Sequence, residues 1–476
     1  MRVGRDLWRL NLKMASFYKA PAGKKFVIYQ LGTNNWQREG EFAPGSGILH
    51  EAHHTAYNLM EGYSCYSMYP SQHQTPHPDP KIEVFHLETQ IPICESVSPV
   101  SNYRWHSMSD DDFNAYRSRL EEEVYQQMNR AEELEGCNIS LAIAHHTFLN
   151  PLVLRNVLKR RVKEGKPRCA LACFVHGTAL KMYVHEKAQK DPEEFPLRFL
   201  PMMEKEKIFE DWNGEGVQLC FAISRQQIEA FLEIYPSFPE ERVVISPNGI
   251  NQVVFHPIEG LTLQGLLSEY STFPYEGSSR PAKKIDGSQY DKLVIMVSKF
   301  AGWKRVQALL YAASEYEKKL ERTATVIIGT GPLEAQKELQ DLAFDTLGLK
   351  HVYFIGPQPQ PVLSKFYTVA SVGCFPSYKE PFGMVFVECM ACGTPVIGAN
   401  SGGPKDFVDK SVGELVEESD DVKVIGKEVE SAVVRAVSDD WKSRMRAACI
   451  DLVDKKYSVK KQCNELIENA RKDLNL

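Results

Sequence analysis

Short, almost wholly apolar segments recur along this chain of 476 residues and constrain its fold more than any other feature. One series lies before residue 250, at 26–31, 82–87, 139–144, 170–175, 219–223 and 243–245. A second series lies after residue 290, at 293–297, 325–328, 352–355, 372–375, 396–398 and 415–416. Helical patterns separate these segments, and fully apolar strands between helices are typical of parallel sheets covered on both faces. The sequence therefore predicts an α/β protein with two doubly wound domains.

The boundary between the two domains falls near Pro257, after the first series of strands. The N-terminal domain is predicted to cover residues 26–255 and the C-terminal domain residues 256–457. Residues 258–291 contain Ser, Gly and Pro and have little core pattern, which predicts a linker or a surface insertion. No apolar run reaches the length of a membrane span.

Residues 1–25 differ from the rest of the chain because they carry seven Lys or Arg and one Asp. Val3, Leu7, Leu10 and Met14 recur there at helical spacing. This pattern is typical of an organelle-targeting segment or a membrane-surface anchor, and equally of a short amphipathic helix packed on the domain or a solvated tail. The segment is therefore left out of the fold prediction.

Composition indicates a cytoplasmic enzyme, with residues 1–25 as the one candidate for organelle targeting or peripheral membrane contact. Eleven cysteines show no disulfide-framework spacing, which is expected of reduced thiols. The formal net charge of -6 argues against nucleic acid as a general partner. Either a monomer or a homo-oligomer is compatible with the sequence.

A turn near residue 380 predicts the ligand class. The apolar strand 372–375 leads through Glu380 and Gly383 into a predicted helix at 384–391. The turn presents backbone N–H groups, and the positive end of the helix attracts phosphate without a metal. Glu380 before the helix and Glu388 one turn into it offer carboxylates to neutral hydroxyls. A diphosphate flanked by two polyols is a nucleotide sugar.

The same residues carry a family resemblance. Glu380 and Glu388 with Phe382 and Gly383 between them, followed by the segments 391–397 and 401–404, resemble retaining glycosyltransferase family 4. The resemblance implies the GT-B fold, in which two Rossmann-like domains face each other across a cleft. It also implies that the C-terminal helix, here about 458–476, crosses back to the first domain.

The activity implied by the resemblance is that of a retaining hexosyltransferase of the EC 2.4.1 type. It moves a hexosyl unit from a nucleotide diphosphate sugar, with UDP-glucose as the expected donor, to a hydroxyl of an acceptor. The acceptor stays open among a sugar, a polyol, a sugar phosphate, a lipid and a glycan. No cofactor and no metal are expected, since the nucleotide sugar is a co-substrate and no Asp-x-Asp motif ends a strand.

The resemblance also implies the donor contacts. We expect Lys299 and Lys304 on the diphosphate, where positive charge stabilises the leaving nucleotide. Lys299 departs from the family, which usually has Arg there, and so loses the bidentate fork. The loop before Gly45 is longer than the family's Gly-Gly loop, so the assignment of its glycines stays open. The expected donor-binding residues are Lys299, Lys304, Gly45, Gly47, Gly329, Phe382, Gly383, Met384, Val385 and Glu388.

Three residues are expected to be catalytic. Glu380 holds the ring hydroxyls of the donor, His176 stabilises the oxocarbenium-like state, and Lys304 stabilises the departing phosphate. The expected reaction is a same-face displacement in which a phosphate oxygen takes the proton of the acceptor. No side chain is then needed as a general base.

Acceptor contacts are expected at the ends of strands in the first domain, from His145, His146, Trp36 and Arg38. Adjacent residues of an extended strand point in opposite directions, which argues against joint metal ligation by His145 and His146. The His-rich segment 50–54 fits no common zinc ligand set.

Two other classes of protein remain as alternatives. A phosphorylase-like enzyme shares the general architecture and requires a lysine-bound pyridoxal phosphate. An inactive, glycan-binding scaffold would have no turnover, and the intact Glu380 and Glu388 argue against it.

Overall fold

The computed structural model describes residues 25–36, 45–72, 75–88, 108–188, 206–474 and 476. The predicted basic extension, apart from Lys25, and the predicted acceptor residue Arg38 lie outside the described residues. The chain divides into two compact units. Among the described residues, the first unit contains those from Lys25 to Gly249 together with those from Val459 onward, and the second contains Ile250–Ser458.

The first unit is built on a parallel sheet of seven strands in the order β3-β2-β1-β4-β5-β6-β7. The strand order reverses between β1 and β4, because the chain adds β2 and β3 on one side and the later strands on the other. Every residue of β1 and β5 is buried, as expected of strands covered on both faces. The strands are β1 (Phe26–Leu31), β2 (Tyr63–Ser71), β3 (Ile82–His86), β4 (Ile139–His145), β5 (Ala170–Val175), β6 (Leu219–Ala222) and β7 (Val243–Ile245).

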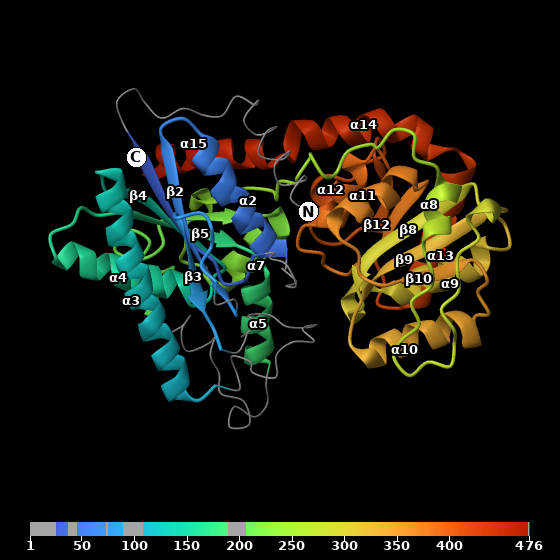
Figure 1. Cartoon of the computed structure of the whole chain (residues 1–476), viewed down its shortest axis with the longest axis horizontal. Coiled ribbons are helices and arrows are strands. Elements are labelled where there is room, and N and C mark those ends of the chain that lie inside the picture. The colour runs from blue at the N-terminus through green and yellow to red at the C-terminus, as the bar shows by residue number, and fades with distance from the viewer. Residues whose placement is uncertain (1–24, 37–44, 73–74, 89–107, 189–205, 475) are drawn as a thin grey trace. The chain divides into compact units, whose positions relative to one another are not determined.

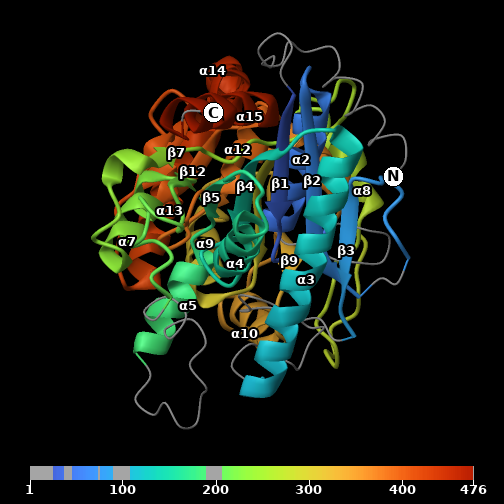
Figure 2. The same cartoon turned by 90° about the vertical axis from the view of Figure 1, so that its left-hand side faces the viewer.

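Helices cover both faces of this sheet (Figure 1). α3 and α4 contact each other on one face, which Figure 2 shows from the side, while α2 and α15 contact each other on the opposite face. α3 begins after Ser109, whose hydroxyl accepts a hydrogen bond from the Asp112 amide at 3.1 Å and so caps the helix. The helices are α2 (Gly45–Leu59), α3 (Asp110–Glu135), α4 (Asn150–Lys163), α5 (Thr178–Lys187), α7 (Arg225–Ile234) and α15 (Val459–Leu474).

The C-terminal helix α15 packs in the first unit against α2 and β6. Its apolar side is buried through Cys463, Leu466, Ile467 and Ala470. Gln462 fixes the helix with three hydrogen bonds: its Oε1 accepts from His53 Nε2 and from the Gly249 amide, each at 2.9 Å, and its Nε2 donates to the Ser246 carbonyl at 3.4 Å. One buried amide therefore holds α2, α15 and the chain leaving β7.

The second unit contains a parallel six-stranded sheet in the order β10-β9-β8-β11-β12-β13. Its strands are β8 (Lys292–Lys299), β9 (Thr323–Thr330), β10 (Val352–Ile355), β11 (Val372–Phe375), β12 (Val396–Ala399) and β13 (Gly413–Val416). Its α-helices are α8 (Leu263–Glu269), α9 (Val306–Tyr316), α10 (Leu333–Asp341), α11 (Gln360–Val369), α12 (Met384–Ala391), α13 (Val422–Ser438) and α14 (Trp441–Lys456). The two sheets confirm the predicted α/β class with two doubly wound, Rossmann-like units.

Two parts of the fold differ from the expectation. β2 is an additional strand, in which buried Ser64 and Ser67 alternate with tyrosines and so hide the apolar signal. Residues 258–291, expected as a linker or surface insertion, contain α8 and are packed into the second unit, where Leu267 and Tyr290 are buried. The buried side chains of this segment follow no regular period, which is why the pattern did not reveal them.

Replacing Gln462 by Leu should lower the free energy of unfolding by about 1–3 kcal/mol, because the buried Gly249 amide and the His53 ring lose their partner. Urea unfolding followed by circular dichroism measures the change. Glu468→Gln, at an exposed position of the same helix, is the matched control. Equal stability of the two variants would show that the Gln462 contacts contribute nothing.

Candidate donor and acceptor sites

The second sheet reverses its strand order between β8 and β11, and ligands of open α/β sheets bind where such a reversal occurs. β8 ends at Lys299 and β11 ends at Phe375. The segments 300–305 and 376–383 leave the sheet side by side at this point. They carry Lys304 and Glu380, two of the residues predicted to be catalytic.

Lys304 and Glu380 form an ion pair, with 2.6 Å between Lys304 Nζ and Glu380 Oε2. The two side chains are only 14% and 10% exposed, so water screens the pair little. The ammonium group also lies 4.1 Å from the centre of the Trp303 ring. The structure thus places a cation and a carboxylate next to each other at the edge of the sheet.

The backbone of Glu380 is held by the loop that follows β12. Glu380 forms a parallel bridge with Gly402, and its carbonyl accepts a hydrogen bond from the Gly403 amide at 2.7 Å. Gly402 has φ of 78°, and a Cβ there would lie 2.3 Å from the Glu380 carbonyl oxygen. Only glycine allows this approach. The position of Glu380 therefore depends on two loops.

α12 begins directly after this loop, with Gly383 in the left-handed region at φ of 101°. The amides of Met384 and Val385 belong to the first turn, whose N–H groups have no acceptor within the helix. They give this end of α12 a partial positive charge. The Phe382 ring is buried, with its centre 5.5 Å from that of Phe407 and 5.8 Å from that of Tyr457.

Glu388 lies inside α12 and is buried. Its Oε2 is 3.5 Å from the hydroxyl of Tyr367, which is fully buried in α11. Burial raises the pKa of the Glu388 carboxyl to about 7, although the Tyr367 hydroxyl opposes the shift. This carboxyl group therefore changes its charge near neutral pH.

Lys299 and Gly329 end neighbouring strands and meet at the same edge. In the pairing of β8 with β9, Ser298 is opposite Gly329 and Lys299 is opposite Thr330. A Cβ on Gly329 would lie 1.8 Å from the Ser298 carbonyl oxygen, so the close approach of the strands requires glycine. These two predicted donor residues are thus brought together with the loop that carries Lys304.

Arg305 is a residue of this site that the sequence analysis missed. It has φ of 52° at the start of α9, and its guanidinium pairs with the carboxylate of Glu418 after β13. The guanidinium carbon also lies 4.7 Å from the centre of the Tyr378 ring, in the segment after β11. Arg305 thereby joins the segments that follow β8, β11 and β13. Its position beside Lys304 was the only signal in the sequence.

The first sheet reverses its strand order between β1 and β4, and histidines gather there. His145 Nδ1 is 3.0 Å from His176 Nε2, and His145 Nε2 is 3.2 Å from Gln30 Oε1. The His146 ring centre lies 4.6 Å from that of His176. An extended strand was predicted to point His145 and His146 in opposite directions. Both instead reach His176, because His146 leaves the strand with φ of 70°.

The other residues predicted for this unit lie around the first turn of α2. Trp36 is buried, stacks on Tyr69 with ring centres 4.6 Å apart, and donates from Nε1 to His50 Nδ1 at 3.0 Å. Its ring is therefore part of the packing beneath the histidines. Gly47 approaches the Asn35 carbonyl so closely that a Cβ would lie 2.1 Å from the oxygen, whereas Gly45 has open space around it.

Burial lowers the pKa of the clustered histidines, namely His50, His53, His145, His146 and His176. The pKa falls to about 4 for His53 and to about 3 for His146. These rings are neutral at pH 7, so each presents one donor and one acceptor nitrogen. Among the described residues, no group of three or more His, Cys, Asp or Glu side chains is arranged to hold a metal ion.

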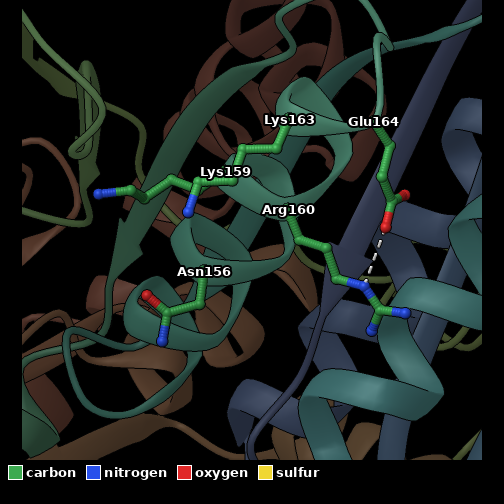
Figure 3. A pocket seen from close by; sticks show the side chains of 5 residues that line it. All are labelled: Asn156, Lys159, Arg160, Lys163 and Glu164. Atoms are coloured by element: carbon green, nitrogen blue, oxygen red, sulfur yellow. Dashed lines mark hydrogen bonds and ion pairs between the residues drawn. The ribbon is translucent and has the colours of Figure 1, made fainter.

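A cavity of about 390 Å³ lies on the surface of α4 and is lined by Asn156, Lys159, Arg160, Lys163 and Glu164 (Figure 3). Arg160 donates to Glu164 at 3.2 Å and to Glu122 at 2.6 Å. Lys159 pairs with Glu215 at 2.5 Å. Two of the cations that line the cavity, Lys159 and Arg160, thus have carboxylate partners, and none of the predicted site residues lines the cavity.

In the part of the chain that the structure describes, no helix is long and apolar enough to cross a bilayer.

The second unit contains a segment that matches a known protein family. Residues 280–448 match the family described as glycosyl transferases group 1. The second unit carries a group 1 glycosyltransferase domain. This glycosyltransferase domain contains Lys299, Lys304, Glu380 and Glu388, together with Arg305.

Curated relatives resemble part of the chain. The D-inositol 3-phosphate glycosyltransferase of Thermomonospora curvata is 30% identical over 242 residues, which are 49% of this chain and 52% of that protein. The protein of the same name from Mycobacteroides abscessus is 36% identical over 201 residues, or 40% of this chain and 39% of that protein. The chain thus spans about half the length of the curated relatives that it matches, or less.

Solved structures resemble nearly the whole chain. Sucrose-phosphate synthase from Thermosynechococcus elongatus has a TM-score of 0.62 at 17% identity, covering 95% of this chain and 100% of that one. HepE of Anabaena in complex with UDP and glucose has a TM-score of 0.62 at 15% identity, covering 94% and 100%. The two Rossmann-like units with the glycosyltransferase domain therefore have the GT-B fold.

The histidine cluster should make the first unit sensitive to acid between about pH 6.5, the pKa of an unfolded histidine, and about pH 4. Unfolded histidines have a pKa of about 6.5, and the folded ones have lower pKa values, so protons bind the unfolded chain preferentially. The stabilisation is complete above the unfolded pKa and is lost progressively as the pH falls from that value to the folded pKa, which is about 4 for His53 and about 3 for His146. Each histidine of the cluster should contribute up to about 1.4 kcal/mol per pH unit there.

Urea unfolding at several pH values measures this dependence. His146→Gln should reduce the loss of unfolding free energy with acid, while His256→Gln, at an exposed position of the second unit, should not. A free energy of unfolding that stays constant over this window would contradict the assignment.

Proposed function

We propose that this protein is a retaining hexosyltransferase of the EC 2.4.1 type, which uses a nucleotide diphosphate sugar and a hydroxyl acceptor. The observation that carries the proposal is the ion pair of Lys304 and Glu380 beside the first turn of α12. A cation, a carboxylate and the amides of a first helical turn suit a phosphate that is bonded to a sugar. These groups lie in the segment that matches the glycosyltransferase family.

The donor is proposed to bind along this edge with its diphosphate against the amides of Met384 and Val385. Lys299 and Lys304 supply positive charge to the phosphates. Glu388 accepts hydrogen bonds from the ribose diol, and Glu380 accepts them from the hydroxyls of the transferred sugar. UDP-glucose is the proposed donor, and the complex of the Anabaena neighbour with UDP and glucose supports that choice.

The proposed reaction is a same-face displacement. The acceptor hydroxyl attacks the anomeric carbon as the bond to the diphosphate breaks, and an oxygen of the leaving phosphate takes the hydroxyl proton. Glu380 and His176 stabilise the positive charge that develops on the sugar, and Lys304 stabilises the negative charge on the phosphate. The fixed charges of the protein take the part of a divalent cation, so the reaction is proposed to need no metal and no cofactor.

The acceptor is proposed to bind at the histidine cluster of the first unit. Neutral His145, His146 and His176 can donate to and accept from hydroxyls, which suits a polyol or a sugar. His146 Nδ1 and the Thr147 hydroxyl are buried and have no hydrogen-bond partner among the described residues. The names of the relatives and of one neighbour refer to an inositol phosphate and a sucrose phosphate, so phosphorylated acceptors belong in the test panel.

Glu380→Gln should lower the turnover number by roughly 100-fold or more, the scale of losing one fixed electrostatic contact to the transition state. The amide keeps the size of the carboxylate but not its charge, so affinity for the nucleotide should change much less. Transfer from UDP-glucose to a panel of sugars, polyols and sugar phosphates is the assay. Glu428→Gln, an exposed glutamate of α13, is the control. Near-normal turnover in Glu380→Gln would contradict the mechanism.

The same assay tests the other parts of the proposal. Product analysis by NMR should show the anomeric configuration of the donor, and a chelator should leave the rate unchanged. An inverted product would exclude the same-face displacement. A loss of transfer with chelator that a divalent ion restores would exclude metal independence.

Affinity for UDP should rise with pH from 6 to 7.5, because Glu388 must be ionised to accept both hydroxyls of the ribose. With a pKa of about 7 in the free protein, the affinity loses up to about tenfold per pH unit on the acid side. Isothermal titration calorimetry of the wild type and Glu388→Gln measures this. The titration of the nucleotide itself cancels in the ratio of the two affinities, and a constant ratio would argue against the ribose contact.

A further inference from the structure

α14 packs against α12, the helix that carries Glu388, and contacts the turn that follows α12. The turn contains Gly393 with φ of 75°, where a Cβ would lie 2.9 Å from the side chain of Arg446 in α14. Lys442, in the first turn of α14, reaches past this turn. Its ammonium group donates to the hydroxyl of Thr394 and, at 3.1 Å, to the carbonyl of Thr368. α14 therefore contacts the ends of two helices of the site.

Hydrogen bonds continue from Lys442 to the Glu388 carboxylate. The Thr394 hydroxyl is fully buried and donates to the carbonyl of Tyr367 at 2.6 Å. The Thr394 amide donates to the carbonyl of Cys389 at 3.2 Å, within α12. Tyr367 in turn places its hydroxyl 3.5 Å from Glu388 Oε2. Two hydrogen-bonded residues thus separate the ammonium group from the carboxylate.

The location of the ammonium group explains how a lysine is held there. The carbonyls of Tyr367 and Thr368 belong to the last turn of α11, and the turn at Thr394 follows the last turn of α12. Both helix ends carry partial negative charge, which favours a cation. A charge-assisted hydrogen bond is also roughly twice as strong as one between neutral groups. The positive charge of Lys442 therefore holds the two helix ends together.

We propose that Lys442 is a positioning residue for the nucleotide site, which fixes α11 against α12 and so sets Tyr367 against Glu388. This inference rests on the proposed contact between Glu388 and the ribose. Lys442 acts through Thr394 and Tyr367 and touches no substrate. It should accordingly affect the affinity for the nucleotide far more than the chemical step, in contrast to Lys304.

The surroundings of Lys442 give the proposal a distinctive pH dependence. Burial lowers the pKa of Lys442 to about 8. The thiols that face Lys442 have higher pKa values and so stay protonated where Lys442 titrates. Burial raises the pKa of Cys392 to about 11, that of Cys449 to about 12 and that of Cys389 well above its usual value. The pKa of Tyr367 is raised as well, and Arg446 is the neighbouring cation that lowers the pKa of Lys442 further.

Between pH 6 and 9.5 two groups of this chain of contacts therefore change charge. Glu388 gains its charge near pH 7, and Lys442 loses its charge near pH 8. UDP affinity should be highest between these two values and fall on either side. Of the two groups, only Lys442 contributes to the decline on the alkaline side.

Calorimetric titration with UDP across this pH range tests the proposal in four proteins. At pH 7.5, Lys442→Met should bind UDP roughly five- to twentyfold more weakly than the wild type, the range expected for one or two lost hydrogen bonds. Lys442→Arg keeps a positive charge at every pH used and should stay within about threefold of the wild type. Lys456→Met, at an exposed position of the same helix, is the matched control.

The pH profiles separate positioning by charge from simple packing. The ratio of wild-type to Lys442→Arg affinity should fall by about three- to tenfold from pH 7.5 to 9.5, and the titration of UDP itself cancels in this ratio. In the transfer assay, Lys442→Met should raise KM for the donor and leave kcat within about twofold. If Lys442→Met does not fold, the profile of Lys442→Arg still decides.

Two results would overturn the inference while leaving the proposed function intact. One is an alkaline decline in Lys442→Arg equal to that of the wild type, and the other is a UDP affinity of folded Lys442→Met equal to that of Lys456→Met. A wild-type protein that binds neither UDP, GDP nor ADP would instead overturn the proposed function, and this inference with it.

Discussion

Parallel pairing of β8 with β9 and β11 is the constraint on which the proposed donor site depends. Because all strands of a parallel sheet end at the same edge, segments that are distant in sequence emerge together there. Lys304 and Glu380 are 76 residues apart in the chain and 2.6 Å apart in the structure. Neither side chain makes a site alone. The register of the sheet brings the cation, the carboxylate and the first turn of α12 to one place.

The side chains at the strand-order reversals of the two sheets differ in charge: those of the second sheet are charged, and those of the first are neutral. At the reversal of the second sheet, charges are kept and paired, as in Lys304 with Glu380 and Arg305 with Glu418. At that of the first sheet, burial keeps His145 and His176 neutral, and they bond to each other. Charged groups suit a substrate whose charge shifts during reaction, whereas neutral donors and acceptors suit hydroxyls. This contrast matches the division of donor and acceptor that we propose.

The sequence predicted those parts of the structure that local chemistry determines. β1 and β5 are apolar throughout, and the turn at Glu380 and Gly383 is readable because helix-end chemistry lies within a few residues. β2 was missed because the serines in it are satisfied by partners elsewhere in the chain, such as His54 for Ser67. Arg305 and Lys442 were missed for the same reason. Their partners Glu418 and Thr394 are 113 and 48 residues away.

The backbone bridge between Glu380 and Gly402 has a consequence for how such an enzyme can diversify. The amide of Gly403 donates to the carbonyl of Glu380, so backbone contacts join the loops after β11 and β12 into one structural unit. A change of sugar preference by loop exchange must then transplant residues 376–383 and 400–403 as a pair. If only one loop were transplanted, the carboxylate at position 380 and the loop that holds its backbone would come from different proteins. Recombination between relatives would preserve function only where its crossover points lie outside the interval from 376 to 403.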